Sequence, residues 1–245
     1  ALRLCTTDFV ALLNPDAFPA ETWLECLVSA AEAHPACAAF GSRQLSAGDP
    51  RIIDGIGDLY HVTGRVWREG CGRVQGTEDL VPKEIFSPCA AAALYRRKAV
   101  EEVGGFDEDY FCYVEDVDLG FRLRLAGYSA RYVPEAVVLH CGSAVTGGQH
   151  SDFSIYHGHR NLVWTFVKNM PAPLFWTLLP GHILLNLATV VALTVKGRGK
   201  VIWKAKWDAV KRLPTMWEKR RAIQRGRVAT VNQIWAALSK GLFPF

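Results

Sequence analysis

The sequence has no closely spaced pair of cysteines. Its seven cysteines lie singly along 245 residues, and no Cys-x-x-Cys motif occurs. Structural zinc sites and disulfide frameworks use recurrent cysteine spacings, so this odd and unpatterned set is typical of reduced thiols in a cytoplasmic protein. The fold must therefore depend on its hydrophobic residues, which make up 50% of the chain and suffice for one core with an appendage.

Charged residues are absent from one long segment. Residues 172–195 contain no Asp, Glu, Lys or Arg over 24 positions, and a helix that crosses a bilayer needs roughly 20 apolar residues. Pro180, Gly181 and Asn186 interrupt the apolar run. Three arrangements fit this pattern: one broken membrane span, a re-entrant hairpin, or a pair of helices lying in the membrane plane.

Positive charge gathers directly after the apolar run. Residues 196–228 hold twelve Lys or Arg, two acidic residues and three Trp. Because Lys240 adds one positive charge to this local +10 and the whole chain carries +4, residues 1–195 carry −7. Basic, Trp-rich helices lie on anionic membranes, and a basic flank marks the cytoplasmic side of an apolar segment. Nucleic-acid binding would leave the apolar run unexplained, so we predict contact of residues 172–228 with a membrane surface and no nucleic-acid partner.

Negative charge is concentrated in residues 104–128, GGFDEDYFCYVEDVDLGFRLRLAGY. Carboxylates repel one another, so their gathering beside aromatic residues indicates a metal, a bound cation or a proton-transfer role. A solvated acidic loop leading into a helix is the alternative, because acidic residues in a first turn interact favourably with the helix dipole. The carboxylates are Asp107, Glu108, Asp109, Glu115, Asp116 and Asp118.

The second half of this stretch has the periodicity of a helix. Apolar residues recur at helical spacing, and Gly127 is a natural stop. We expect Arg122 and Arg124 to project away from the apolar face. Glu115 and Asp116 then lie where a loop becomes a helix, which suits a general base aimed into a cleft. The apolar positions are Val117, Phe121 and Leu125.

Residues 104–128 resemble the acidic signature of family 2 glycosyltransferases, especially their rhamnosyltransferase-like branch. The resemblance implies that Asp116 deprotonates the acceptor hydroxyl, with Glu115 as its neighbour. It also implies a GT-A-type α/β fold, in which a mixed sheet is flanked by helices.

The front of the chain has an α/β pattern. An apolar run at residues 9–13 predicts a strand, residues 23–31 have helical spacing, and residues 36–40 predict a second strand. Ligands of such sheets bind beyond the carboxyl ends of strands, where Asp16 lies, although Asn-Pro-Asp is also an ordinary turn. Residues 12–17, LLNPDA, resemble the Asn-x-Asp variant of the family's metal-binding motif. The resemblance implies that Asp16 binds Mg²⁺ or Mn²⁺ on the donor's diphosphate, with Asn14 as a weaker or indirect ligand.

Residues 43–88 read as long loops with short strands, and residues 88–95 as a strand of small side chains. Strands are also predicted at residues 130–133 and 136–139, broken at Pro134. His140 follows them, and a histidine at a strand end is more often a surface residue than a ligand. The family resemblance implies a metal-binding histidine at this point, which would bind as neutral imidazole.

Residues 156–161, YHGHRN, resemble the Arg-Asn pair that follows the catalytic domain in the rhamnosyltransferase-like branch. The resemblance implies a cofactor-binding role for Arg160 and Asn161, with Arg160 holding a phosphate bidentately. The alternative is an arginine on a helix surface.

We therefore predict a glycosyltransferase catalytic domain at residues 1–165 and a helical, membrane-associating tail at residues 166–245. A chain that begins at Ala1, so close to its first strand, is expected to lack the upstream strands that bind the nucleotide. The resemblance implies inverting transfer of rhamnose from dTDP-rhamnose, the nucleotide-sugar donor. The acceptor is a hydroxyl of a glycan or a polyprenyl-diphosphate-linked sugar, at the cytoplasmic face of the membrane.

Two other functions fit parts of the sequence. A non-catalytic, membrane-bound remnant or partner subunit would need no donor site. A nucleotidyltransferase also has acidic metal sites at strand ends, but the Glu115-Asp116 helix suits removal of an acceptor proton better than a second metal site.

Overall fold

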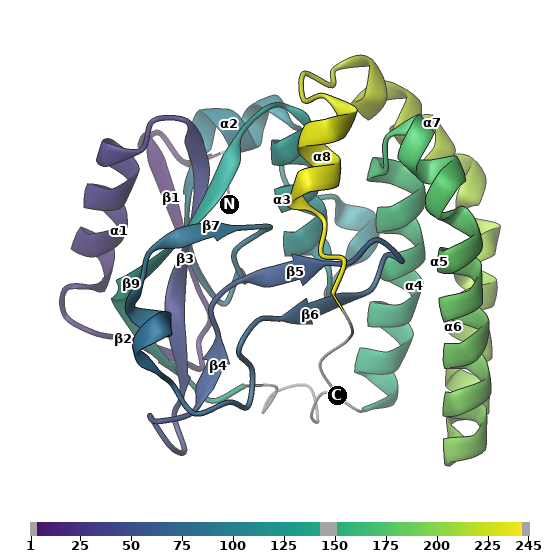
Figure 1. The fold of residues 1–245 in the computed structure, drawn as a ribbon, viewed down its shortest axis with the longest axis horizontal. Coiled ribbons are helices and arrows are strands. Elements are labelled where there is room, and N and C mark those ends of the chain that lie inside the picture. The colour runs from purple at the N-terminus through teal and green to yellow at the C-terminus, as the bar shows by residue number, and fades with distance from the viewer. Residues whose placement is uncertain (1–3, 143–150, 242–245) are drawn as a thin grey trace.

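The protein is built around a mixed β-sheet with helices on both sides (Figure 1). A computed structural model describes residues 4–142 and 151–241. The central sheet has seven strands in the order β1-β8-β3-β9-β2, with β4 paired to β3 and β7 paired to β9, and β5 and β6 form a separate hairpin. The strands are β1 (Phe9–Leu13), β2 (Ala17–Pro19), β3 (Cys37–Ser46), β4 (Ile53–Gly55), β5 (Asp58–Tyr60), β6 (Val66–Arg68), β7 (Lys83–Ile85), β8 (Ala92–Arg96) and β9 (Ser129–His140).

Three strands of this sheet run in the same direction. β3 and β9 are parallel, while β8 is antiparallel to both β3 and β1. The carboxyl ends of β1, β3 and β9 therefore meet at one edge of the sheet. This is the edge at which α/β sheets bind ligands.

Two strand predictions were wrong in extent. The strand predicted at residues 36–40 continues to Ser46, because its polar residues Ser42 and Gln44 are buried between neighbouring strands. The two strands predicted on either side of Pro134 are one strand, β9. Its pairing with β3 shifts between Ser42 and Arg43, so Pro134 lies in an irregularity that needs no ladder hydrogen bond.

Helix α1 (Trp23–Ala33) covers one face of the sheet and α3 (Glu115–Leu125) lies on the other. α1 begins and ends where the apolar spacing predicts, and it buries Trp23 and Leu27. Two short 3₁₀ turns, Thr77–Leu80 and Glu108–Tyr110, and helix α2 (Arg97–Glu102) complete this part. The mixed sheet with flanking helices confirms the predicted α/β class.

Helix α3 is buried on almost every side, which corrects the expectation for its arginines. Leu119 packs toward the sheet, whereas Phe121 packs toward the tail. Arg122 and Arg124 are buried as well. Arg124 donates to the backbone carbonyls of residues 85 and 86. The helix lies between two layers, so no face is left for a charged side chain in solvent.

The tail is a set of helices stacked beside α3 (Figure 1). Its elements are α4 (Asp152–Asn169), α5 (Ala172–Leu193), a π-helical turn (Thr194–Arg198), α6 (Gly199–Lys211), α7 (Leu213–Arg225) and α8 (Val231–Ala237). The boundary expected between residues 165 and 166 falls inside α4, which packs against α3, α6 and α7. Helix α4 therefore joins the two predicted parts.

The apolar segment forms one arm of a helical hairpin. Gly197 has a φ of 78°, which breaks the helix between α5 and α6. Val190 of α5 and Ile202 of α6 belong to one buried cluster with Ile155 of α4. In a straight helix these two residues would lie too far apart for a shared partner, so α6 turns back along α5.

Candidate active site

The strand edge brings Asp16, Asp54 and His140 together. Ala17 pairs with His140 across β2 and β9, and Cys141 N donates to Asp16 O at 3.0 Å. The Oδ1 atom of Asp16 lies 3.4 Å from Nε2 of His140. The Oδ2 atom of Asp54 lies 2.8 Å from Nδ1 of the same ring. The imidazole is thus held between two carboxylates.

This arrangement leaves a gap that a cation fits. Burial raises the pKa of Asp54, but its hydrogen bond with His140 and the charge of Arg68 bring the pKa below its ordinary value. The ionised Asp54 accepts a hydrogen bond from Nδ1. Nε2 is buried and has no hydrogen-bond partner among the described residues. A cation held by Nε2 and the Asp16 carboxylate would give this nitrogen a partner.

The site offers a metal few protein ligands. Within residues 4–142 and 151–241, no group of three or more His, Cys, Asp or Glu is arranged to hold a metal ion. Asn14 lies on the wall of the adjoining cavity, and its backbone N donates to Ala91 O at 2.8 Å. Asp16 and His140 thus fit a hard divalent cation that takes its other ligands from phosphate and water.

The second end of the site is the start of α3. Oδ2 of Asp116 accepts from Ala90 N at 3.0 Å, and Oδ1 accepts from Val117 N at 2.8 Å. The neighbouring Ala91 carbonyl accepts from Asn14 N. The small-residue segment before β8 therefore contacts both ends of the site, which only small side chains permit.

Two more carboxyl groups near Asp116 favour their neutral forms. Burial, with the charge of Asp116, raises the pKa of Glu115 to about 8. Burial and the same charge raise the pKa of Asp58 to about 8. Asp116 is the member whose oxygens receive backbone N–H bonds. Among these three residues, Asp116 can thus act as a carboxylate that takes up a proton, while Glu115 and Asp58 are neutral acids beside it.

A cavity of about 510 Å³ is lined by Asn14, two residues before Asp16, and by Glu115, the neighbour of Asp116, and its size is typical of small-molecule sites. Its wall combines carboxylates with apolar and aromatic side chains. The lining residues include Asn14, Ala90, Phe106, Glu108, Phe111 and Glu115.

Three of the other acidic residues in this stretch, Asp107, Asp109 and Asp118, are paired with lysines of the tail. Lys168 Nζ lies 2.6 Å from Asp107 and 2.8 Å from Asp118. Lys219 of α7 reaches Asp107 and Asp109. Burial raises the pKa of Asp118, but the charges of Arg122 and Lys168 bring it down to about 2. The role of these carboxylates could not be decided from the sequence. Their ion pairs with lysines account for them without a metal ion.

Arg160 and Asn161, for which the sequence predicts a cofactor-binding role, contact the loop before α3. The Asn161 amide is buried and donates to the carbonyls of residues 110, 112 and 113. Arg160 donates to the carbonyls of Asp109 and Tyr110. Their donors are therefore directed at the loop before α3.

Sequence reasoning missed Asp54 and Lys168. Asp54 lies in a Gly-rich region with no motif around it, and its aspartate-glycine dipeptide indicates only a turn. Lys168 lies in a helix, where a lysine is normally solvated. For Lys168, the apolar residues on both sides of it were the one available signal.

Comparisons with known proteins identify the family of the chain. The family described as glycosyl transferase family 2 matches residues 1–104, and glycosyl transferase family group 2 matches residues 80–195. N-acetylglucosaminyl-diphospho-decaprenol L-rhamnosyltransferase of Mycobacterium tuberculosis is 34% identical over 195 residues, which cover 70% of this chain and 60% of the relative. The chain thus spans less than two thirds of that relative.

Two further likenesses are more distant. The pre-mycofactocin glycosyltransferase of Mycobacterium tuberculosis is 31% identical over 210 residues, covering 80% of this chain and 42% of that protein. The solved mannosyltransferase of Pyrobaculum calidifontis, in complex with GDP-Man and Mn²⁺, aligns with a TM-score of 0.46 and 17% identity. The alignment covers 96% of this chain and 64% of that one.

Proposed function

The chain belongs to the family 2 glycosyltransferases, and we propose that it transfers a sugar, with inversion, from a nucleotide-diphosphate donor to an acceptor hydroxyl. The observation that carries the proposal is the contact of Asp16 with the unpartnered Nε2 of His140, beside a cavity whose wall runs from Asn14 to Glu115, the neighbour of Asp116. One end suits a cation with a diphosphate, and the other suits removal of a proton.

Each described residue then has a chemical task. Asp116 accepts the proton of the acceptor hydroxyl, whose oxygen attacks the anomeric carbon while the bond to the nucleotide diphosphate breaks. Asp16 and His140 hold Mg²⁺ or Mn²⁺, which when bound supplies positive charge beside the leaving diphosphate. Asp54 fixes the tautomer of His140 through the 2.8 Å contact at Nδ1. Glu115 stays neutral beside the base.

The classes of donor and acceptor are inferred from similarity to a named relative. The similar protein of Mycobacterium tuberculosis is named as a rhamnosyltransferase acting on N-acetylglucosaminyl-diphospho-decaprenol. We extend this to dTDP-rhamnose as the donor and a polyprenyl-diphosphate-linked sugar as the acceptor, in synthesis of a cell-envelope polysaccharide.

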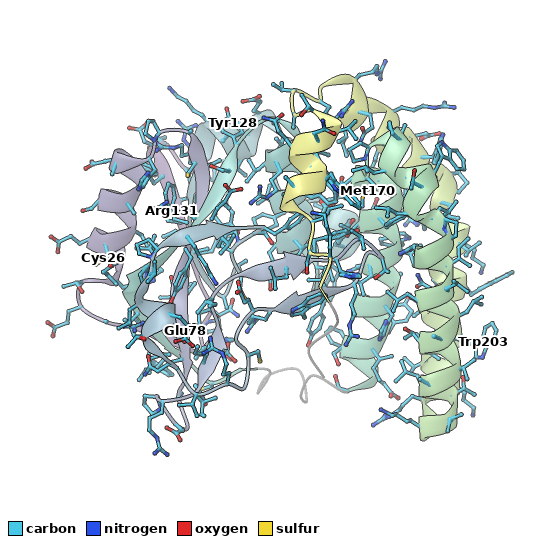
Figure 2. The ribbon with its side chains drawn as sticks, in the orientation of Figure 1. Cys26, Glu78, Tyr128, Arg131, Met170 and Trp203 are labelled. Atoms are coloured by element: carbon cyan, nitrogen blue, oxygen red, sulfur yellow. The ribbon has the colours of Figure 1, made fainter. Side chains whose placement is uncertain are left out.

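The tail supports an acceptor carried by a membrane. One stretch, Ala172–Lys211, is long and apolar enough to cross a bilayer by composition. Its inner side is attached to the catalytic part: His182 stacks on Phe166 at 4.0 Å and contacts Thr63 O at 2.7 Å. Figure 2 shows Trp203 projecting outward from α6. We propose that the hairpin lies in the plane of the cytoplasmic face. The exposed apolar residues include Trp176, Leu184, Leu187, Val191, Trp203 and Trp207.

Nucleotide binding tests the catalytic proposal. We would titrate dTDP and UDP by calorimetry, with Mn²⁺ present and then chelated, in the wild type and in His140→Ala. Metal-dependent dTDP binding that His140→Ala abolishes is the expected result. Binding of neither nucleotide would favour the alternative of a non-catalytic partner subunit.

Vesicle binding tests the tail. The double variant Trp203→Gln, Trp207→Gln should sediment less with vesicles that contain phosphatidylglycerol, because interfacial Trp and anionic lipid both contribute. Trp235→Gln on α8 is the matched control. Equal binding to neutral and anionic vesicles by all three proteins would contradict the proposed docking surface.

A further inference from the structure

The loop before α3 has a strained backbone. Phe111 has φ 65° and ψ −63°, and Cys112 N donates to Tyr110 O at 2.8 Å. These values define the rare, strained form of the γ-turn. Tyr113 and Val114 also have positive φ, and these three are the non-glycine residues with positive φ in the described part of the chain. Positive φ is costly for a β-branched residue such as Val114, and such strain gathers at functional sites.

Side chains of α4 hold this loop. The amide Nδ2 of Asn161 donates to Tyr110 O at 3.1 Å, Cys112 O at 2.9 Å and Tyr113 O at 2.7 Å. Arg160 donates to Tyr110 O at 2.9 Å through Nη2, and its Nε donates to the Asn161 side chain at 2.9 Å. These contacts add donors to Tyr110 O, which already accepts the hydrogen bond of the γ-turn, and give partners to the carbonyls of Cys112 and Tyr113.

The held loop presents an aromatic ring at the cavity. Phe111 lines the cavity and is 75% exposed. On its other side the ring contacts His157, with centroids 5.4 Å apart, and Phe153, with centroids 6.4 Å apart. An apolar ring kept in solvent by a strained backbone has no folding benefit that would offset its cost.

The chemistry of the cavity fits a sugar ring. A pyranose has an apolar C–H face that stacks on an aromatic ring and hydroxyls that donate to carboxylates. The cavity offers Phe111 for the first and the carboxylate of Glu108 for the second. An anionic group such as a diphosphate would meet the Glu108 carboxylate unfavourably. The occupant beside Phe111 is therefore a neutral, polyhydroxylated ring.

Resting on the transferase function proposed above, we propose that Phe111 is the platform on which the acceptor's sugar ring stacks, and that Asn161 and Arg160 are positioning residues that hold it there. The loop leads directly into Glu115 and Asp116, so the same hydrogen bonds set the ring and the start of the base-bearing helix. Asn14, two residues before Asp16, lines the same cavity as Phe111.

Acceptor kinetics test the platform. The probe is a short-chain prenyl-diphospho-N-acetylglucosamine, with dTDP-rhamnose saturating. Phe111→Ala should raise the acceptor KM about tenfold, the order expected for loss of one stacking contact. It should change kcat little, and Phe111→Tyr should restore the KM. Trp235→Ala, another exposed aromatic residue removed far from the site, should match the wild type. A wild-type KM in Phe111→Ala would overturn the platform.

A second pair of variants tests the positioning residues. Asn161→Ala should raise the acceptor KM as Phe111→Ala does. Adding Val114→Gly should lower it again, because glycine adopts positive φ without strain. A loss of general stability would not be cured by that glycine, so failure of the rescue overturns the role of Asn161. If Asn161→Ala does not fold, Arg160→Ala is used instead. That substitution removes the hydrogen bonds of Arg160 to the loop and leaves the buried amide of Asn161 in place.

Calorimetry with dTDP separates this proposal from the one on which it rests. Each variant should bind dTDP as the wild type does. A wild type that binds dTDP but transfers to no acceptor would overturn both proposals. A wild-type enzyme with an unaffected Phe111→Ala variant would overturn only the platform.

Discussion

The two ends of the candidate site are held in different ways. Asp16 directly precedes β2 and His140 ends β9, and the backbone pairing between these two strands sets their separation. Asp116 follows a loop with positive φ that depends on side chains of α4. The strand end is fixed by neighbours in the sheet, whereas the helix end is fixed by residues far along the chain. The first should tolerate side-chain changes that the second does not.

Replacement of the base gives the largest expected effect. Asp116→Asn removes the group that takes the acceptor proton and keeps its shape, so transfer should fall about 10²- to 10⁴-fold. Initial rates with dTDP-rhamnose measure this loss, and dTDP calorimetry should show unchanged affinity. If the variant also lost its affinity for dTDP, the strand end and the helix end of the site would depend on each other, which would contradict the comparison.

Removal of Lys168 tests how far the helix end depends on the tail. Lys168 is 1% exposed and lies between Asp107 and Asp118. Lys168→Met removes one of the two cations paired with each of Asp107 and Asp118 and leaves Lys219 and Arg122 in place. The loss of unfolding free energy should therefore be a part of the cost of a fully unpaired buried carboxylate, which is about 3–5 kcal/mol. Urea denaturation measures this change. The exposed Lys204, paired with Asp208, is the control: Lys204→Met should leave the midpoint almost unchanged. Equal midpoints for both variants would show that the tail does not stabilise this end.

The same contrast explains what the sequence can predict. Asp16 and His140 follow apolar runs whose strands, β1 and β9, run in the same direction, so their place at one edge was predictable. Their contact was not, because it depends on the short antiparallel strand β2. Asp116 was predictable as a helix start. The roles of Asn161 and Lys168 were not, because their partners lie about fifty residues away and a polar residue in a helix has the same local pattern whether buried or solvated.

Asp54 offers a smaller test at the strand end. It touches the imidazole of His140 rather than the site for the cation, so Asp54→Asn should weaken Mn²⁺ affinity about 10- to 100-fold while the fold persists. Titration of Mn²⁺ with dTDP bound measures the change. Asp49→Asn, which removes an exposed partner of Arg51 in the same region, should leave Mn²⁺ affinity as it is. Equal affinity in the two variants would contradict the orienting role of Asp54.

The smallest effect concerns pH and separates the ends by their electrostatics. At the helix end burial opposes charge: it is the main cause that raises the pKa of Glu115 from 4.5 to about 8. The folded protein therefore binds this proton where the unfolded chain has lost it, so the stability it contributes is complete below pH 4.5 and is lost as pH rises through about 8.

Glu115→Gln should remove that dependence. The amide stays neutral at every pH. As the pH rises from 5 to 8.5, the melting temperature of the variant should therefore increase relative to that of the wild type, by about 2–4 °C for each kcal/mol that the buried charge costs. Thermal melts across this range measure the gap. Any dependence of the melting temperature on pH that remains in the variant is assigned to Asp58, whose pKa is also raised to about 8 by burial. Parallel curves for the two proteins would mean that Glu115 is already ionised at neutral pH, and the helix end would then hold two charges beside each other.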